Sequence, residues 1–215
     1  MNTTIRDPGV LHDTLGTGEY YLIFGVKTYY IARLNTDMIS FAEEPRPVTI
    51  HNSIGTNGPG KTGDKPFLHV YNSTYYLSWG GFYATGTSPY GPFSFRGSVI
   101  STAHIAPDFR MNETNPDPSA WWAAEDQADR HGSFFQLHGQ WYFACNDRSH
   151  SSDKAHPGAY RDPVLAYVHY LSNGSIAPLV IDEQGGERTS YRYVCLCVCV
   201  FVCDFCNKRY CLMSL

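Results

Sequence analysis

The strongest constraint on the fold is a pattern that occurs three times along the chain. Each copy has a short apolar segment that begins with a polar residue, then a polar turn, then a segment rich in aromatic residues. Two strand-like segments separated by turn residues predict a β-hairpin. The three copies are Asp7–His12 with Glu19–Gly25, Asp64–His69 with Thr74–Gly80, and His131–Gln136 with Gln140–Asn146.

Further strand-like segments follow each hairpin. A period of about 60 residues with about four strands per unit is typical of a β-propeller. The predicted fold class is therefore all-β, an incomplete β-propeller with about three blades of four-stranded antiparallel sheet. A β-sandwich with coincidentally similar segments is the alternative. Third strands are expected at Tyr29–Leu34, Phe82–Gly86 and Val164–Tyr170, and later segments at Asp37–Phe41, Val48–Ile50, Pro92–Gly97 and Ser175–Val180.

The first residue of each repeat is a candidate site residue. In a propeller the innermost strand of every blade begins beside the central channel, so Asp7, Asp64 and His131 (or the adjacent Asp129) are expected to converge. The alternative interpretation is structural, because Asp caps turns and Pro fixes φ. Propellers close with roughly four to eight blades. We therefore expect further blades outside this chain, or an oligomer that completes the ring.

Composition argues against two classes of partner. The chain has 16 Lys and Arg against 20 Asp and Glu, which gives a net charge of −4. Binding to the phosphate backbone of a nucleic acid needs clustered cations, so a nucleic-acid partner is not expected. No run of about 18 apolar residues occurs, so no membrane span is expected.

Four N-x-[ST] sequons indicate a secreted glycoprotein. The segment Met1–Pro8 contains no apolar stretch, so we expect the signal peptide to be missing from this chain. The predicted location is extracellular. The sequons begin at Asn2, Asn72, Asn112 and Asn173.

Cysteine is concentrated at the C-terminal end. Six of the seven cysteines lie between Cys195 and Cys211, and the segment alternates Val and Cys without a polar face. A zinc site at Cys203-x-x-Cys206 is one interpretation, but only one such pair occurs. Read-through into an intron near Arg192 is the interpretation we favour. The predicted organisation is a partial propeller domain at 1–190 and a tail at 191–215 that is not native structure.

A long segment at 101–130 separates the second and third repeats. It contains Trp121, Trp122 and several acidic residues. Long loops on a rigid scaffold often shape binding sites. Trp79, Trp121 and Trp122 are therefore candidate stacking platforms for a sugar.

The repeats resemble the five-bladed propeller of glycoside hydrolase family 43, which comprises arabinofuranosidases, xylosidases and arabinanases. The resemblance covers about residues 5–185. The second blade of that family is matched by Asp7-Pro-Gly-Val and by Tyr29-Tyr-Ile-Ala-Arg-Leu-Asn-Thr-Asp-Met-Ile-Ser. The third is matched by Lys65-Pro-Phe-Leu-His-Val-Tyr-Asn-Ser-Thr-Tyr-Tyr-Leu-Ser-Trp with Ser88-Pro-Tyr-Gly-Pro-Phe, and the fourth by His131-Gly-Ser-Phe-Phe with Gly139-Gln-Trp-Tyr-Phe.

The resemblance implies a role for each matched residue. Asp7 stands at the position of the carboxylate that tunes the pKa of the general acid, and Asp64 stands at the position of the acid itself. That acid is normally Glu, so a shorter side chain stands here. His131 matches a residue beside the channel that in some members helps to hold calcium or water, and Arg161 matches a substrate-contacting arginine. The general base has no counterpart in this sequence.

Inverting glycoside hydrolysis explains why two carboxyl groups are wanted. One carboxylic acid protonates the leaving oxygen while a carboxylate about 6.5–9.5 Å away activates water. The expected function is hydrolysis of arabinose- or xylose-containing glycans, with this chain inactive by itself and a monomer when complete. This chemistry requires no cofactor. A calcium ion in the central channel is an alternative that the sequence leaves open. A non-catalytic sugar-binding propeller is the alternative function, and Glu125 is an alternative general acid.

Overall fold

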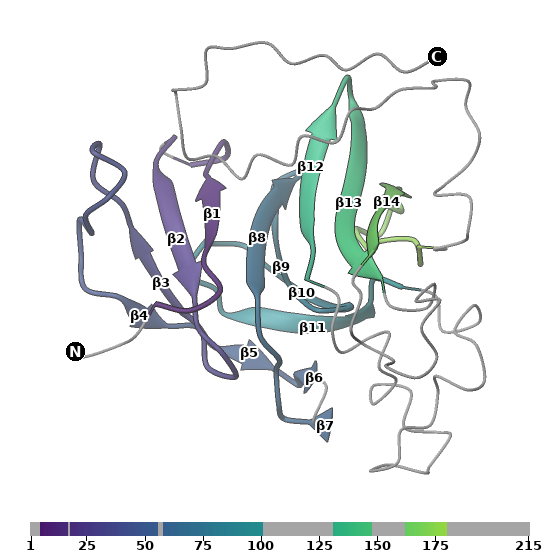
Figure 1. Ribbon diagram of the computed structural model, residues 1–215, viewed down its shortest axis with the longest axis horizontal. Coiled ribbons are helices and arrows are strands. Elements are labelled where there is room, and N and C mark those ends of the chain that lie inside the picture. The colour runs from purple at the N-terminus through teal and green to yellow at the C-terminus, as the bar shows by residue number, and fades with distance from the viewer. Residues whose placement is uncertain (1–4, 17, 56–57, 101–130, 148–161, 180–215) are drawn as a thin grey trace.

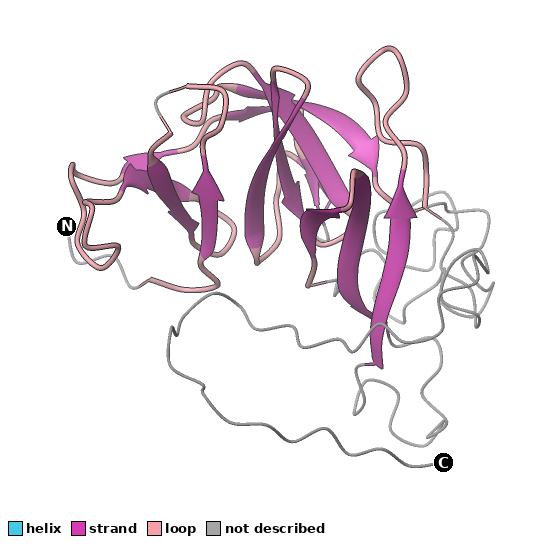
Figure 2. Cartoon of the chain, turned by 90° about the horizontal axis from the view of Figure 1, so that it is seen from above, coloured by secondary structure: helices cyan, strands magenta, loops and turns pink. Residues whose placement is uncertain are grey.

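The described chain is built entirely from strands and loops. The computed structural model describes residues 5–16, 18–55, 58–100, 131–147 and 162–179. Figure 2 shows their strands and loops. No helix that could cross a bilayer occurs in this described part of the chain. The prediction of an all-β fold is confirmed.

The strands form three main sheets and one small hairpin. The first sheet has the order β1 (Gly9–His12), β2 (Tyr20–Phe24), β3 (Tyr30–Arg33) and β4 (Arg46–Pro47). The second has the order β5 (Ile50–His51), β11 (Phe93–Ser98), β10 (Phe82–Gly86), β9 (Thr74–Trp79) and β8 (Pro66–Tyr71). The third has the order β12 (Ser133–Leu137), β13 (Gln140–Asp147) and β14 (Asp162–Val168), and the hairpin consists of β6 (Ile54–Gly55) and β7 (Gly58–Pro59).

The first strands of the three sheets lie side by side. β8 contacts both β1 and β12, and the three strands run in the same direction (Figure 1). The start of β1 approaches the start of β8 closely, because a Cβ atom on Gly9 would lie 2.9 Å from the carbonyl oxygen of Pro66. A larger residue at this position would push the two strands apart. The residues that precede these strands therefore gather at one end.

Turn chemistry fixes the hairpin registers. Asn72 and Ser73 join β8 to β9 with φ values of 43° and 62°, and Tyr71 pairs with Thr74. His138 and Gly139 join β12 to β13 with φ values of 51° and 83°. Positive φ at both central residues is the signature of the type I′ turn, which matches the twist of the flanking strands.

Two hydrophobic cores lie between the sheets. The first joins the first and second sheets and includes Ile23, Ile31 and Leu77, all of which are fully buried. The second joins the second and third sheets and includes Tyr83 and Phe143. Each sheet thus packs face to face with its neighbour, as the blades of a propeller do.

A fourth strand was predicted for the third repeat at Ser175–Val180. This prediction is wrong, because the described residues 175–179 form no strand. Instead of a strand, this segment makes two isolated bridges, Tyr170 with Ile176 and Ile100 with Leu179. Another difference is β5, which leaves the first repeat and pairs in parallel with β11 of the second. The predicted segment 101–130, the domain boundary at 190 and the cysteine-rich tail lie outside the described residues.

Candidate functional site

The three predicted site residues at the repeat starts lie at the same end of the inner strands. Asp7 comes two residues before β1, Asp64 two residues before β8, and His131 two residues before β12. Because the three strands are neighbours and run in the same direction (Figure 1), the repeat starts face a shared region. All three residues are half-buried. The three candidate site residues are therefore gathered at one end of the inner strands.

Tyr29 is buried beside the segment that carries Asp64. Its ring is 1% exposed, and its hydroxyl donates a 3.1 Å hydrogen bond to the carbonyl oxygen of Gly63, the residue before Asp64. Burial raises the pKa of Tyr29 above its usual range, and the negative charges of Asp64 and Asp7 raise it further. Both carboxylates therefore lie within electrostatic reach of one buried hydroxyl.

The turn between β2 and β3 holds both aspartate-bearing segments. The Gly25 amide donates to the carbonyl oxygen of Arg6 at 2.9 Å, and the Lys27 amide donates to that of Gly63 at 2.8 Å. Gly25 adopts a φ of 125°, and a Cβ there would lie 2.2 Å from the Thr28 carbonyl oxygen. Only glycine fits this turn. One tight turn thus places the residue before Asp7 and the residue before Asp64.

The backbone is left-handed at both acidic segments. Asp7 has a φ of 48° and Lys65 a φ of 61°. Non-glycine residues in this region cost of order 1–3 kcal/mol and persist where the surrounding structure fixes them, often at functional sites. Lys65 Nζ lies 3.4 Å from Asp64 Oδ2, and the Asp64 side chain keeps 40% of its surface exposed. The carboxylate is accessible to a substrate.

His131 is placed by the third sheet. Its backbone amide donates a 2.7 Å hydrogen bond to Asn146 Oδ1 on β13. The next residue, Gly132, packs so closely that a Cβ would lie 2.3 Å from the Phe143 ring. The start of β12 is therefore fixed against β13.

Trp79 does not occupy a binding surface, and its predicted role is corrected. The indole is 1% exposed, and it packs in the first core near Tyr29, Phe82 and Phe95. Its Nε1 donates a 3.0 Å hydrogen bond to the Ile54 carbonyl oxygen. A ring enclosed on all sides cannot stack on a sugar. The other predicted residues Arg161, Trp121, Trp122, Glu125 and Asp129 lie outside the described residues.

Metal ligands do not come together within the described ranges. No group of three His, Cys, Asp or Glu side chains there could hold an ion. Calcium needs six to eight oxygen ligands, so the residues described do not form a calcium site by themselves. Calcium in the channel stays a prediction, and no chemical step is derived through it.

Sequence reasoning missed several residues that build the site's surroundings. Tyr29 directly precedes β3 and is 1% exposed, whereas the next residue, Tyr30, is half-buried. Asp13 begins the polar turn of the first repeat, yet it is 2% exposed and accepts a 2.8 Å hydrogen bond from the Tyr75 hydroxyl on β9. His69 is buried between the second and third sheets. Alternation along the strands could have indicated burial for Tyr29 and His69, but not their partners.

Comparisons with known proteins agree with the predicted resemblance. No protein-family model matches the chain. A xylosidase/arabinosidase of Bacteroides ovatus is 28% identical over 181 residues, which cover 66% of this chain and 48% of that protein. The chain thus spans about half the length of this curated relative.

Solved structures show the same fold. A glycoside hydrolase family 43 enzyme of Xanthomonas citri, solved with xylose, is 25% identical with a TM-score of 0.57, covering 81% of this chain and 56% of that one. A family 43 arabinoxylan arabinofuranohydrolase of Bacillus subtilis, solved with cellotetraose, is 21% identical with a TM-score of 0.62, covering 85% and 38%. The three sheets are blades of a five-bladed β-propeller, and the resemblance to family 43 is confirmed.

Proposed function

We propose that this chain is part of a glycoside hydrolase that acts on arabinose- or xylose-containing glycans by an inverting mechanism. The observation that carries the proposal is that Asp7 and Asp64 stand at the same end of neighbouring inner strands, two residues before β1 and two residues before β8. The relative named xylosidase/arabinosidase and the similar enzyme solved with xylose support the substrate class.

Each residue has a role in this proposal. Asp64 donates the proton to the oxygen of the leaving sugar as the glycosidic bond breaks, and Asp7 orients Asp64 and modulates its protonation. A carboxylate about 6.5–9.5 Å away deprotonates the attacking water on the opposite side of the sugar ring. That base comes from outside the matched repeats. His131 contacts the substrate from the third blade, and Arg161 supplies a further substrate contact.

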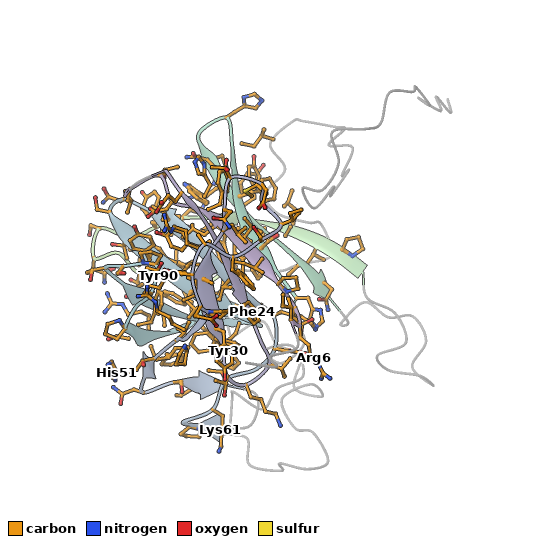
Figure 3. All side chains as sticks on the ribbon, turned by 90° about the vertical axis from the view of Figure 1, so that its left-hand side faces the viewer. Arg6, Phe24, Tyr30, His51, Lys61 and Tyr90 are labelled. Carbon is orange, nitrogen blue, oxygen red and sulfur yellow. The ribbon has the colours of Figure 1, made fainter. Side chains whose placement is uncertain are left out.

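The outer faces of the first and third sheets support additional blades. Val10 is 45% exposed and Tyr20 38% exposed on the first sheet, and Phe135 is 36% and Leu137 44% exposed on the third. Phe24 and Tyr30 lie close together on this side of the molecule (Figure 3), but their rings stack at 6.0 Å and Phe24 is 1% exposed, so this part of the first sheet is already covered. Apolar faces of this kind are covered by neighbouring sheets in a propeller.

Hydrolysis of nitrophenyl arabinofuranoside and xyloside tests the proposal. The 215-residue chain alone should show no turnover, because the proposal places the general base outside the matched repeats. A protein that carries the same residues together with the remaining blades should turn over at least one of the two substrates. Asp7→Asn and Asp64→Asn should each abolish most of that activity, while His51→Gln, on the exposed strand β5, should not.

Two results would contradict this proposal. Turnover by the 215-residue chain alone would remove the argument for a missing base. Sugar binding that survives Asp7→Asn and Asp64→Asn without activity in any form would favour the non-catalytic sugar-binding propeller instead.

A further inference from the structure

Two of the four sequons lie on neighbouring turns of the structure. Asn72 occupies the turn between β8 and β9, and Asn173 occupies the turn between Leu171 and Ser175. The Tyr76 hydroxyl donates a 2.8 Å hydrogen bond to the Gly174 carbonyl oxygen, which ties the second turn to β9. Both asparagines are exposed. The structure therefore allows the two motifs to be compared.

Local turn chemistry accounts for all of the Asn173 motif. Asn173 Oδ1 accepts hydrogen bonds from the Ser175 amide at 3.0 Å and from the Ser175 hydroxyl. Gly174 has a φ of 78°. These features make an Asx turn. Every residue of this motif has a structural reason to be there.

The Asn72 motif is only partly explained in this way. Asn suits the left-handed first position of a type I′ turn, which accounts for Asn72. Thr74 begins β9 and makes a backbone pair with Tyr71, for which its hydroxyl is not needed. No described residue hydrogen-bonds the Asn72 carboxamide or the Thr74 hydroxyl. The amide acceptor and the hydroxyl two residues later are what the glycosylation motif requires.

The surroundings of Asn72 can accommodate a sugar. The turn borders a hollow of about 160 Å³ lined by Tyr71, Asn72, Thr74, Tyr170 and Ser172, among others. The rings of Tyr71 and Tyr170 stack at 3.7 Å beside it. Hydroxyl and amide groups next to aromatic rings suit the polar and apolar faces of a sugar ring.

The position is also compatible with the proposed active site. Asn72 directly follows β8, whereas Asp64 lies two residues before it. Six strand residues at about 3.3 Å each separate the two ends by about 20 Å. A glycan on Asn72 would therefore leave the Asp7 and Asp64 end open.

We propose that Asn72 is the acceptor of an N-linked glycan when this chain passes through a secretory route that glycosylates N-x-[ST] motifs. In the transfer, Asn72 Nδ2 forms a bond to C1 of the first N-acetylglucosamine of a lipid diphosphate-linked oligosaccharide. The C1–O bond to the diphosphate breaks, the lipid diphosphate leaves, and one amide proton passes to a base of the transferase. The reaction involves no oxidation or reduction, and it is independent of the proposed hydrolase activity.

Peptide mapping of the full secreted chain tests this site. The chain is produced behind a cleavable secretion leader in yeast and is then treated with peptide N-glycosidase in H₂¹⁸O. Asn72 should be recovered as aspartate that carries one ¹⁸O atom. Thr74→Ala should remove this conversion while Asn72 still holds the turn, and Asn72→Asp should do so by removing the acceptor.

Ser175→Ala is the matched control, because it disrupts the Asn173 motif and leaves that of Asn72 intact. Conversion at Asn72 should persist in this variant. Recovery of Asn72 as an unmodified amide from the secreted wild-type chain would overturn the proposal, whatever the result of any hydrolase assay.

Discussion

The hydroxyl of Tyr29 donates a 3.1 Å hydrogen bond to the carbonyl oxygen of Gly63. This bond joins the residue directly before β3 to the residue that precedes Asp64, so the position of one candidate catalytic carboxylate depends on the neighbouring blade. The Lys27 amide donates to the same carbonyl oxygen at 2.8 Å. The site is therefore a product of packing between blades and not of either blade alone.

Removing the Tyr29 hydroxyl should lower stability modestly. Tyr29→Phe keeps the buried ring and loses one hydrogen bond, which should cost about 1 kcal/mol of unfolding free energy. Urea denaturation of both proteins measures the difference. Tyr30→Phe is the control, because its hydroxyl bonds no described residue and should leave the midpoint unchanged. Equal midpoints for Tyr29→Phe and wild type would show that the inter-blade bond contributes nothing.

Asp13 should be far more important for stability than an ordinary turn residue. Its Oδ1 accepts hydrogen bonds from the Leu15 and Gly16 amides at 3.1 Å each and from the buried Tyr75 hydroxyl at 2.8 Å. Asp13→Ala leaves these donors unpaired at a site only 2% exposed, which should cost about 3 kcal/mol. Thermal or urea unfolding measures the loss.

Asp37 provides the matched comparison for Asp13. It accepts hydrogen bonds from the Ile39 and Ser40 amides in the same local pattern, but on an exposed turn. Asp37→Ala should therefore cost much less than Asp13→Ala. Similar losses for the two variants would mean that the turn, and not the buried contact with Tyr75, determines the effect.

The sequence predicted those parts of the fold that depend on local chemistry. The hairpin at Asn72 and Ser73 follows from turn residues between two strand-like segments, although its turn type comes from the structure. The inner strands and the shared end of Asp7, Asp64 and His131 follow from the repeat and the family resemblance. These features recur at a fixed spacing, so one sequence is enough to detect them.

The parts that failed depend on contacts between distant segments. Trp79 was predicted to be an exposed platform, because an aromatic residue is compatible with either a surface or a core. In the structure it packs near Phe95 and Tyr29 in the first core. The segment after Ser175 has strand-like residues, but its contact with the second repeat is a single parallel bridge from Leu179 to Ile100, two residues after β11. Neither outcome has a local signal.

His69 should make the chain less stable in acid. Burial lowers the pKa of His69 from 6.5 to about 3, and the ring lies among Phe67, Tyr76, Phe134 and Trp141. Between these two pKa values the unfolded chain binds a proton that the folded chain does not. The free energy of unfolding should therefore fall as pH falls from about 6.5 toward 3, by up to about 1.4 kcal/mol per pH unit from this group.

Replacing His69 should flatten that pH dependence. His69→Phe keeps a ring in the cavity and removes the titrating group, so its stability should change less than that of the wild type across this range. His138→Asn is the control, because residue 138 lies on an exposed turn with a φ of 51° that Asn adopts readily. Urea titrations at several pH values give the slopes. Parallel slopes for His69→Phe and wild type would contradict the assignment.

Lengthening the proposed acid should raise activity in a protein that carries the complete set of blades. Asp64 stands where the resemblance to family 43 implies Glu, so its carboxyl group is one methylene farther from the leaving oxygen. A misplacement of about 1 Å can cost on the order of a hundredfold in rate. Asp64→Glu should therefore increase kcat on a nitrophenyl pentoside, whereas Asp64→Asn, which keeps the length but cannot donate the carboxylic proton, should lose activity. A lower kcat for Asp64→Glu than for wild type would show that the left-handed backbone at Lys65 and the contact from Lys65 Nζ have already adapted this site to the shorter acid.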